Sequence, residues 1–164
     1  MKINTFEDLY VQSLRDMYSA ETQLLKALKI ASDKATDPTL KQAFLDHREE
    51  TQIHHDTVKE IVEKLDEKAS GHTCDAMKGL IEETQEAIED TQDNRVLDAA
   101  LISMAQKIEH YEIASYGTIR TFAEILGKKD DAQRIQKILD QEYAANDKLT
   151  KIAEKKVNEA AAAA

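Results

Sequence analysis

Apolar residues recur every three or four positions along nearly the whole chain, which is the period of amphipathic helices. Turn and capping residues divide this pattern into four long segments and one shorter segment. Each long segment would form a helix of about 42 to 48 Å at 1.5 Å per residue. The predicted long helices cover residues 5–35, 38–67, 95–126 and 130–157, and the shorter helix covers residues 74–91.

Helix-capping residues support these boundaries. Thr5 and Asp8 have the spacing of a capping box. Asp37 precedes Pro38 as an N-cap residue precedes the first helical position, and Gly127 provides a helix stop. Short connections join the first pair and the last pair of long helices, so each pair is predicted to form an antiparallel hairpin.

The connection between the two hairpins is long enough to travel the length of a bundle. The sequence therefore predicts an all-α protein, a ferritin-like four-helix bundle with a crossover helix between the two helical hairpins. Residues 1–158 are assigned to this single domain. The alanine-rich residues 159–164 are predicted to be a frayed tail without a function of their own.

Acidic residues interrupt the apolar seams of three helices near their midpoints. Glu21 stands between Tyr18 and Leu25, where a core residue is expected. Glu142 takes the same kind of position in the last helix. In the helix at 95–126, Glu112 lies on the seam and Glu109 lies one turn earlier on the same face.

The seam of the second helix is polar in its middle and contains His47, Thr51 and His54. Glu50 lies beside the two histidines. His54 is a candidate ligand or a partner of ligands, and for His47 a hydrogen-bonded core position is favoured over ligation. Glu49 is predicted to face solvent.

In an antiparallel bundle the midpoints of the helices share one layer, so these carboxylates would meet in the core. Burying unpaired carboxylates costs several kcal/mol each even after relaxation, and the interior faces offer no basic residues at these turns. Two divalent cations would offset most of the charge, and oxygen ligands with imidazole suit Fe, or alternatively Mn. The predicted metal ligands are Glu21, Glu50, His54, Glu109, Glu112 and Glu142.

The ligand spacing departs from the Glu-x-x-His pattern of di-iron carboxylate bundles. His54 is the fourth residue after Glu50 rather than the third, and Asn146 is the fourth residue after Glu142. Glu109 and Glu112 form a Glu-x-x-Glu pair instead. The predicted site is therefore richer in carboxylates than that pattern.

Composition narrows the functional classes. The formal net charge is −10, which disfavours binding to nucleic acid and attracts cations. No apolar run is long enough to span a membrane, and the N-terminus lacks the apolar stretch of a signal peptide, so a cytoplasmic protein is expected. Cys74 is the single cysteine, which excludes an internal disulfide and a CxxC metal knuckle.

Several segments resemble the YciE/YciF-type ferritin-like proteins of bacteria, and the resemblance covers nearly the whole chain. The matching segments are Leu14–Glu21, His47–Thr51, Ala76–Glu83, Asp98–Leu101 and Ile108–Gly117. The resemblance implies a rubrerythrin-like bundle, a homodimer and a link to bacterial stress responses. It also carries the five glutamates over as ligands, whereas the family pattern has Gln in place of His54 and Asp in place of Asn146.

Two functions remain open at this point. The first is a di-iron or di-manganese oxidoreductase of the ferroxidase or peroxide-reducing type, which uses O2 or peroxide and takes electrons from an external donor because the chain has no CxxC module. The second is a stress-related structural or interaction dimer in which the carboxylate layer is vestigial or binds a purely structural metal.

Overall fold

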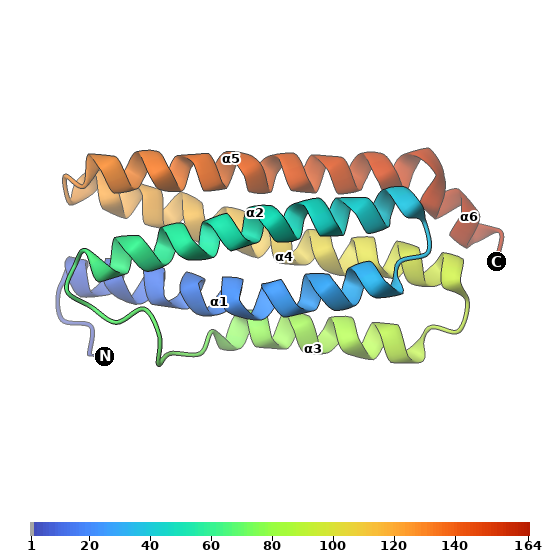
Figure 1. Ribbon diagram of the computed structural model, residues 1–164, viewed down its shortest axis with the longest axis horizontal. Coiled ribbons are helices and arrows are strands. Elements are labelled where there is room, and N and C mark those ends of the chain that lie inside the picture. Colours follow the sequence, from blue (N-terminus) through green and yellow to red (C-terminus); the bar gives the residue numbers. More distant parts are fainter. Residues whose placement is uncertain (1) are drawn as a thin grey trace.

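The computed structural model describes residues 2–164, and its regular elements are all helical over that range. Four long helices lie side by side, and a shorter helix runs along the outside of the bundle (Figure 1). The elements are α1 (Phe6–Lys34), α2 (Pro38–Glu63), α3 (Asp75–Asp90), α4 (Asn94–Ile125), α5 (Lys129–Ile152), a π-helical turn (Ala153–Val157) and α6 (Asn158–Ala162).

Helices α1 and α2 form one antiparallel hairpin, and α4 and α5 form the other (Figure 1). The hairpins pack together through α1 against α4 and through α2 against α5. Helix α3 returns the chain to the far end of the bundle and packs on α1 and α4. This arrangement confirms the predicted four-helix bundle with a crossover helix, and it brings the middles of all four long helices into one layer.

The predicted caps are present. Thr5 and Asp8 form the capping box of α1, and the Asp37 carboxylate accepts hydrogen bonds from the first backbone N–H groups of α2. Gly127 adopts the left-handed conformation after α4, with φ of 73°. Buried Asp98 of α4 fixes the α1–α2 turn, because its carboxylate accepts hydrogen bonds from the backbone N–H groups of Thr36 and Asp37.

Two boundaries differ from the sequence prediction. Helix α2 ends at Glu63 rather than near Glu67, because Asp66 takes a left-handed conformation with φ of 57° that a helix cannot continue. At the C-terminus, where a frayed tail was predicted, the chain instead passes through the π-helical turn into α6, which packs against α4. Alanine has the highest intrinsic helix propensity, so the final alanine run extends helical structure.

Apolar side chains fill the bundle above and below its central layer. Tyr10, Leu14 and Met17 lie near one end of α1 and are fully buried, and Leu24 and Leu28 continue the core on the other side. Among the described residues, none of the helices has the combination of length and apolar composition needed to cross a bilayer. The polar residues that interrupt this core are therefore the features that call for a functional explanation.

Candidate metal centre

Four glutamates meet in the core of the bundle. Glu21 comes from α1, Glu109 and Glu112 from α4, and Glu142 from α5. Glu109 is 3% exposed, and the other three are fully buried. No Lys or Arg is paired with any of these four carboxylates among the described residues. The glutamates that interrupt the apolar seams of α1, α4 and α5 therefore all lie in the same buried layer.

Two histidines of α2 complete this layer. His54 is fully buried, and its Nδ1 lies 2.9 Å from Oε1 of Glu142 and 3.9 Å from Oε1 of Glu21. His47 is 6% exposed, and its Nε2 lies 3.3 Å from Oε1 of Glu109 and 3.7 Å from Oε2 of Glu142. Every long helix thus contributes at least one side chain to the layer.

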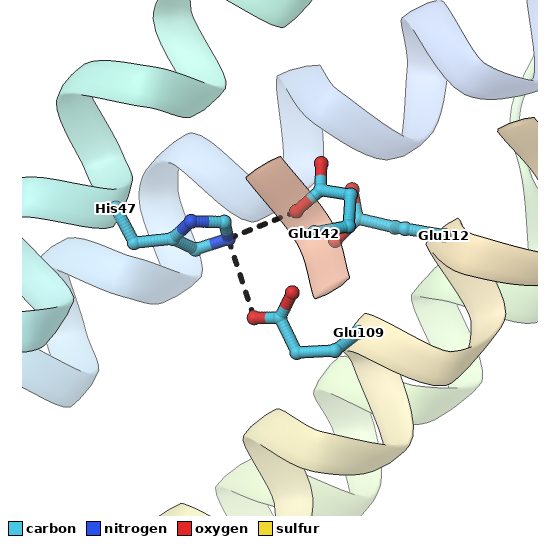
Figure 2. A group of neighbouring side chains, drawn as sticks. All are labelled: His47, Glu109, Glu112 and Glu142. Atoms are coloured by element: carbon cyan, nitrogen blue, oxygen red, sulfur yellow. Dashed lines mark ion pairs between the residues drawn. The ribbon is translucent and has the colours of Figure 1, made fainter. Parts of the chain in front are cut away.

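The six side chains form two groups that could each hold a metal ion. His47, Glu109, Glu112 and Glu142 make up the first group, and their ligand atoms lie within 4.8 Å of one another. Figure 2 shows His47 pointing from α2 toward the carboxylates of α4 and α5. Glu21, His54 and Glu142 make up the second group. Glu142 belongs to both groups, so it would be shared if each group held a cation.

Many polar atoms of this layer make no hydrogen bond of acceptable geometry within the protein, even where, as for Nδ1 of His54 and Oε1 of Glu142, two of them lie close together. Such buried atoms each cost about 1 to 3 kcal/mol, and more when charged, unless something else satisfies them. The orphaned atoms are Oε2 of Glu21, Nε2 of His47, Nδ1 of His54, Oε2 of Glu109, and both carboxylate oxygens of Glu112 and Glu142. Two further buried atoms without a partner, Nε of Arg15 and Nε of Arg120, lie outside the layer. The unpartnered atoms are thus concentrated in the two groups, as expected for a layer that receives a partner other than a side chain.

The outward nitrogens of both histidines have partners. Nδ1 of His47 lies 3.3 Å from Oε2 of Glu50, and Nε2 of His54 lies 3.0 Å from Oε1 of Gln141. When these outward nitrogens carry the proton, the inward nitrogens present lone pairs to the carboxylates. Metal-binding histidines in proteins are characteristically oriented in this way by a second hydrogen bond.

The layer also perturbs its own proton equilibria. Burial raises the pKa of Glu21 and of Glu109 to about 8, despite the opposing charge of the histidines. Burial and the neighbouring carboxylates hold the pKa of Glu112 well above its usual value. For His47, burial acts to lower the pKa, but the charges of Glu109 and the contact with Glu50 raise it to about 10. Without another cation, protons would therefore neutralise much of this layer.

Tyr116 of α4 supports the layer from one side. Its side chain is fully buried, and its hydroxyl donates a hydrogen bond to Oε1 of Glu21. This contact fixes one carboxylate oxygen of Glu21 and leaves Oε2 without a hydrogen-bond partner. A buried phenol at this position orients a ligand without adding charge.

The residue set fits a pair of divalent cations. Four buried carboxylates carry four negative charges when ionised, which two divalent ions would balance. The donor atoms are carboxylate oxygens and imidazole nitrogens, a set that suits Fe or Mn. Six side chains from four helices in two groups with one shared carboxylate also match the general plan of di-metal carboxylate bundles.

Sequence comparison agrees with this architecture. The family model described as "Domain of unknown function (DUF892)" matches residues 5–162. The chain belongs to the DUF892 family. Within this family, the Escherichia coli (strain K12) protein YciF is 45% identical over 162 residues, which cover 98% of each chain.

Solved structures of similar chains share the fold of this DUF892 protein. The crystal structure of E. coli YciF, described as a stress protein, gives a TM-score of 0.90 at 45% identity and covers 95% of this chain and 99% of that one. YcfI from Rhodopseudomonas palustris gives a TM-score of 0.87 at 44% identity, covering 91% and 95% of the two chains. A Xanthomonas campestris protein at 23% identity gives a TM-score of 0.79 over 95% and 96%, which shows the shared fold alone.

The DUF892 chain brings together five of the six residues that the sequence predicted as ligands. Glu50 lies outside both groups, with 41% of its side chain exposed and its carboxylate on Nδ1 of His47. His47, for which a core position was favoured, takes the inner place. The sequence did contain a sign that His47 faces the core, because it lies seven residues before His54 on the same helical seam.

Two other residues that the sequence marked have partners outside the layer. Asn146 accepts a hydrogen bond from Gln106 of α4, with 3.3 Å between the two side-chain atoms. It is absent from both ligand groups. Glu49 is exposed, as the sequence predicted.

Proposed function

We propose that this protein is a di-metal carboxylate oxidoreductase that binds two iron or two manganese ions and acts as a ferroxidase or as a peroxide-reducing protein. The observation that carries the proposal is the pair of buried ligand groups sharing Glu142, in which the orphaned polar atoms of the core are concentrated. A layer of ionised carboxylates is costly to maintain in a bundle core unless cations bind in it.

Some side chains of the layer would bind the cations, and others orient the ligands. Glu142 stands between the two groups, so its carboxylate would contact both cations. Glu50 and Gln141 hold the outer nitrogens of the two histidines and thereby aim the inner nitrogens. Tyr116 holds Glu21 by its hydroxyl. Because Glu21, Glu109 and Glu112 have raised pKa values, cation binding would release protons from them, and the same carboxylates would be available to accept protons later.

Two redox-active ions would supply electrons for the reduction of peroxide or O2. The described chain offers no second redox module, since Cys74 is its single cysteine. Repeated turnover would therefore use an external electron donor, or Fe²⁺ itself as the reductant in a ferroxidase.

The test is metal loading followed by turnover. The metal-free protein would be loaded with Fe²⁺ under anaerobic conditions, its stoichiometry measured, and H2O2 then added while iron oxidation and peroxide loss are recorded. The proposal predicts two ions per chain and peroxide loss faster than with free Fe²⁺. Glu142→Gln should lose both properties, and Glu49→Gln, an exposed change on α2, should keep both. Full occupancy without any oxidation would rule out the oxidoreductase.

A structural role is the second candidate function. The raised pKa values of the carboxylates favour it, because a protonated layer can persist in the core without any cation. The description of YcfI also proposes a structural role for that protein. This candidate predicts a protein that stays folded and redox-inert after complete metal removal, and the loading experiment separates it from the oxidoreductase.

The cellular setting is part of the proposal. The resemblance to YciF, described as a stress protein, supports a role in a bacterial stress response. We also propose a cytoplasmic location and a homodimer. Light scattering on the purified protein tests the dimer: the expected mass is twice the 18.5 kDa of one chain. A monomer at all concentrations would remove that part of the proposal without affecting the metal centre.

A further inference from the structure

A cavity connects the metal layer to the surface between α2 and α5. Its volume is about 120 Å³, which accommodates several water-sized molecules. Two side chains of the layer, His47 and Glu109, line its inner part. Asp46, Ala144 and Lys148 line it as well and are exposed. These three residues therefore form the mouth of a passage that leads inward to the orphaned Nε2 of His47.

An ion pair links the two helices at this mouth. Nζ of Lys148 on α5 lies 2.8 Å from Oδ2 of Asp46 on α2, and both side chains are about half exposed, at 48% and 47%. Glu50, with 41% of its side chain exposed, lines the same cavity and contacts His47. A cation moving inward would thus meet Asp46 and Glu50 before the ligands. The ammonium group of Lys148 opposes this movement by neutralising Asp46 and repelling the cation.

A second cavity that reaches the layer has a different, mostly apolar lining. It is lined mainly by α1 and α4, with Phe44 of α2 and Thr84 of α3, has a volume of about 20 Å³ and includes Glu109 in its lining. Its remaining lining is apolar except for Thr84 of α3. A hydrated divalent ion would have to shed its water there without replacement oxygen atoms, which is very unfavourable. Of the two cavities, the one between α2 and α5 suits a cation.

We propose that the cavity between α2 and α5 is the entry path for the divalent cations of the metal layer, and that the Lys148–Asp46 ion pair limits the rate of entry. This inference rests on the proposed function, because it requires that the layer bind cations. It assigns control of the rate of cation entry to Lys148 and Asp46, which contact none of the ligand atoms. Cations enter and leave through the same opening. The Lys148–Asp46 ion pair, called the gate below, therefore changes both the loading rate and the release rate.

The experiment measures the rates of Mn²⁺ loading and release rather than redox turnover. Metal-free protein is mixed rapidly with Mn²⁺ at low salt, loss of the free-ion paramagnetic resonance signal gives the loading rate, and a chelator chase gives the release rate. Lys148→Gln should load several-fold faster than the parent, and this gain should shrink as salt is raised. The matched control is Lys107→Gln, because Lys107 is also 48% exposed and paired with a glutamate, Glu83, but lies on α4.

A second variant obstructs the mouth. Ala144→Phe should slow loading and release by the same factor and leave the dissociation constant unchanged, because it alters the path and not the ligands. Its control is Ala114→Phe, at an exposed alanine of α4 away from this cavity. Circular dichroism confirms that each variant is folded, and the lysine variants test the gate independently of the phenylalanine.

The outcomes separate failure of the entry path from failure of the metal centre. If the parent binds two Mn²⁺ ions and both mouth variants load at the parent rate, the entry path is wrong and the metal centre stands. If Lys148→Gln and Lys107→Gln accelerate loading equally, net charge alone explains the gain and the gate is refuted. If the parent binds no Mn²⁺ at all, the proposed function fails, and this inference fails with it.

Discussion

His47 and Glu50 are three residues apart on α2, and Nδ1 of His47 lies 3.3 Å from Oε2 of Glu50. The contact turns the other ring nitrogen of His47 toward Glu109 and Glu142 (Figure 2). It thereby gives the inner place to the histidine and the outer place to the glutamate. The relationship decides which of the two residues is expected to bind metal directly.

The first prediction ranks these two residues. His47→Ala should weaken Mn²⁺ binding more than Glu50→Gln, because the first change removes a ligand and the second keeps a hydrogen-bond acceptor for Nδ1. Loss of an outer partner typically costs about 10- to 100-fold in metal affinity, so Glu50→Gln should fall at or below the lower end. Calorimetric titration of the metal-free proteins measures both constants. The reverse ranking would restore Glu50 as a direct ligand.

The second prediction concerns Glu112, which is fully buried with both carboxylate oxygens unpartnered. Glu112→Gln keeps the volume and removes an ionisable group, so the metal-free protein should be as stable as the parent or more stable, within about 1 kcal/mol at neutral pH. Metal binding should fall sharply. Urea unfolding of both metal-free proteins checks the first expectation. A loss of about 3 kcal/mol or more would mean that Glu112 is a structural hydrogen-bond partner.

The third prediction is a pH dependence of the metal-free protein. Glu21 and Glu109 have pKa values of about 8, raised by burial, and that of His47 is about 10. A group whose pKa is higher in the folded chain stabilises that state below its unfolded pKa, and this stabilisation is lost as pH rises through the folded pKa. The free energy of unfolding should therefore fall by on the order of a few kcal/mol between about pH 7 and pH 10.

Urea unfolding at a series of pH values measures this trend. His54 does not interfere, because burial lowers its pKa and places its titration below this window. The protein loaded with Mn²⁺ provides the comparison, since bound cations keep the carboxylates ionised and should flatten the curve. A free energy that stays constant or rises across the same range would show that the layer is not protonated in the metal-free state.

The fourth prediction concerns metal removal. A ligand that binds only the folded state stabilises it by about 2.7 kcal/mol at a hundred times its dissociation constant. Adding Mn²⁺ to the metal-free protein should therefore raise the thermal midpoint, and a chelator should reverse the shift. Ca²⁺ at the same concentration is the control, because a site containing imidazole nitrogens disfavours it. Equal midpoints with and without Mn²⁺, after binding has been verified, would contradict the prediction.

Much of the fold could be predicted because caps and seams carry their signals locally. The capping box at Thr5 and Asp8, Asp37 before Pro38, and Gly127 each determine a helix end through contacts within a few residues. The end of α2 was missed because Asp66, an ordinary residue in sequence terms, takes a left-handed conformation there.

The candidate site was predicted in part because buried charge is conspicuous on an apolar seam. Glu21, Glu109, Glu112 and Glu142 each interrupt such a seam, and the structure buries all four. Helix α2 gave a weaker signal, since its seam is polar throughout the layer. Residues three apart differ by only about 60° around a helix axis, so periodicity alone could not decide whether His47 or Glu50 turns inward.

The most direct test of the central claim is a crystal structure of the Mn²⁺-loaded protein with anomalous scattering recorded on both sides of the Mn edge. Two anomalous peaks are predicted in the bundle core. One should lie among His47, Glu109, Glu112 and Glu142, and the other among Glu21, His54 and the same Glu142. An empty carboxylate layer in crystals of the loaded protein, or manganese found only at surface carboxylates, would contradict the account.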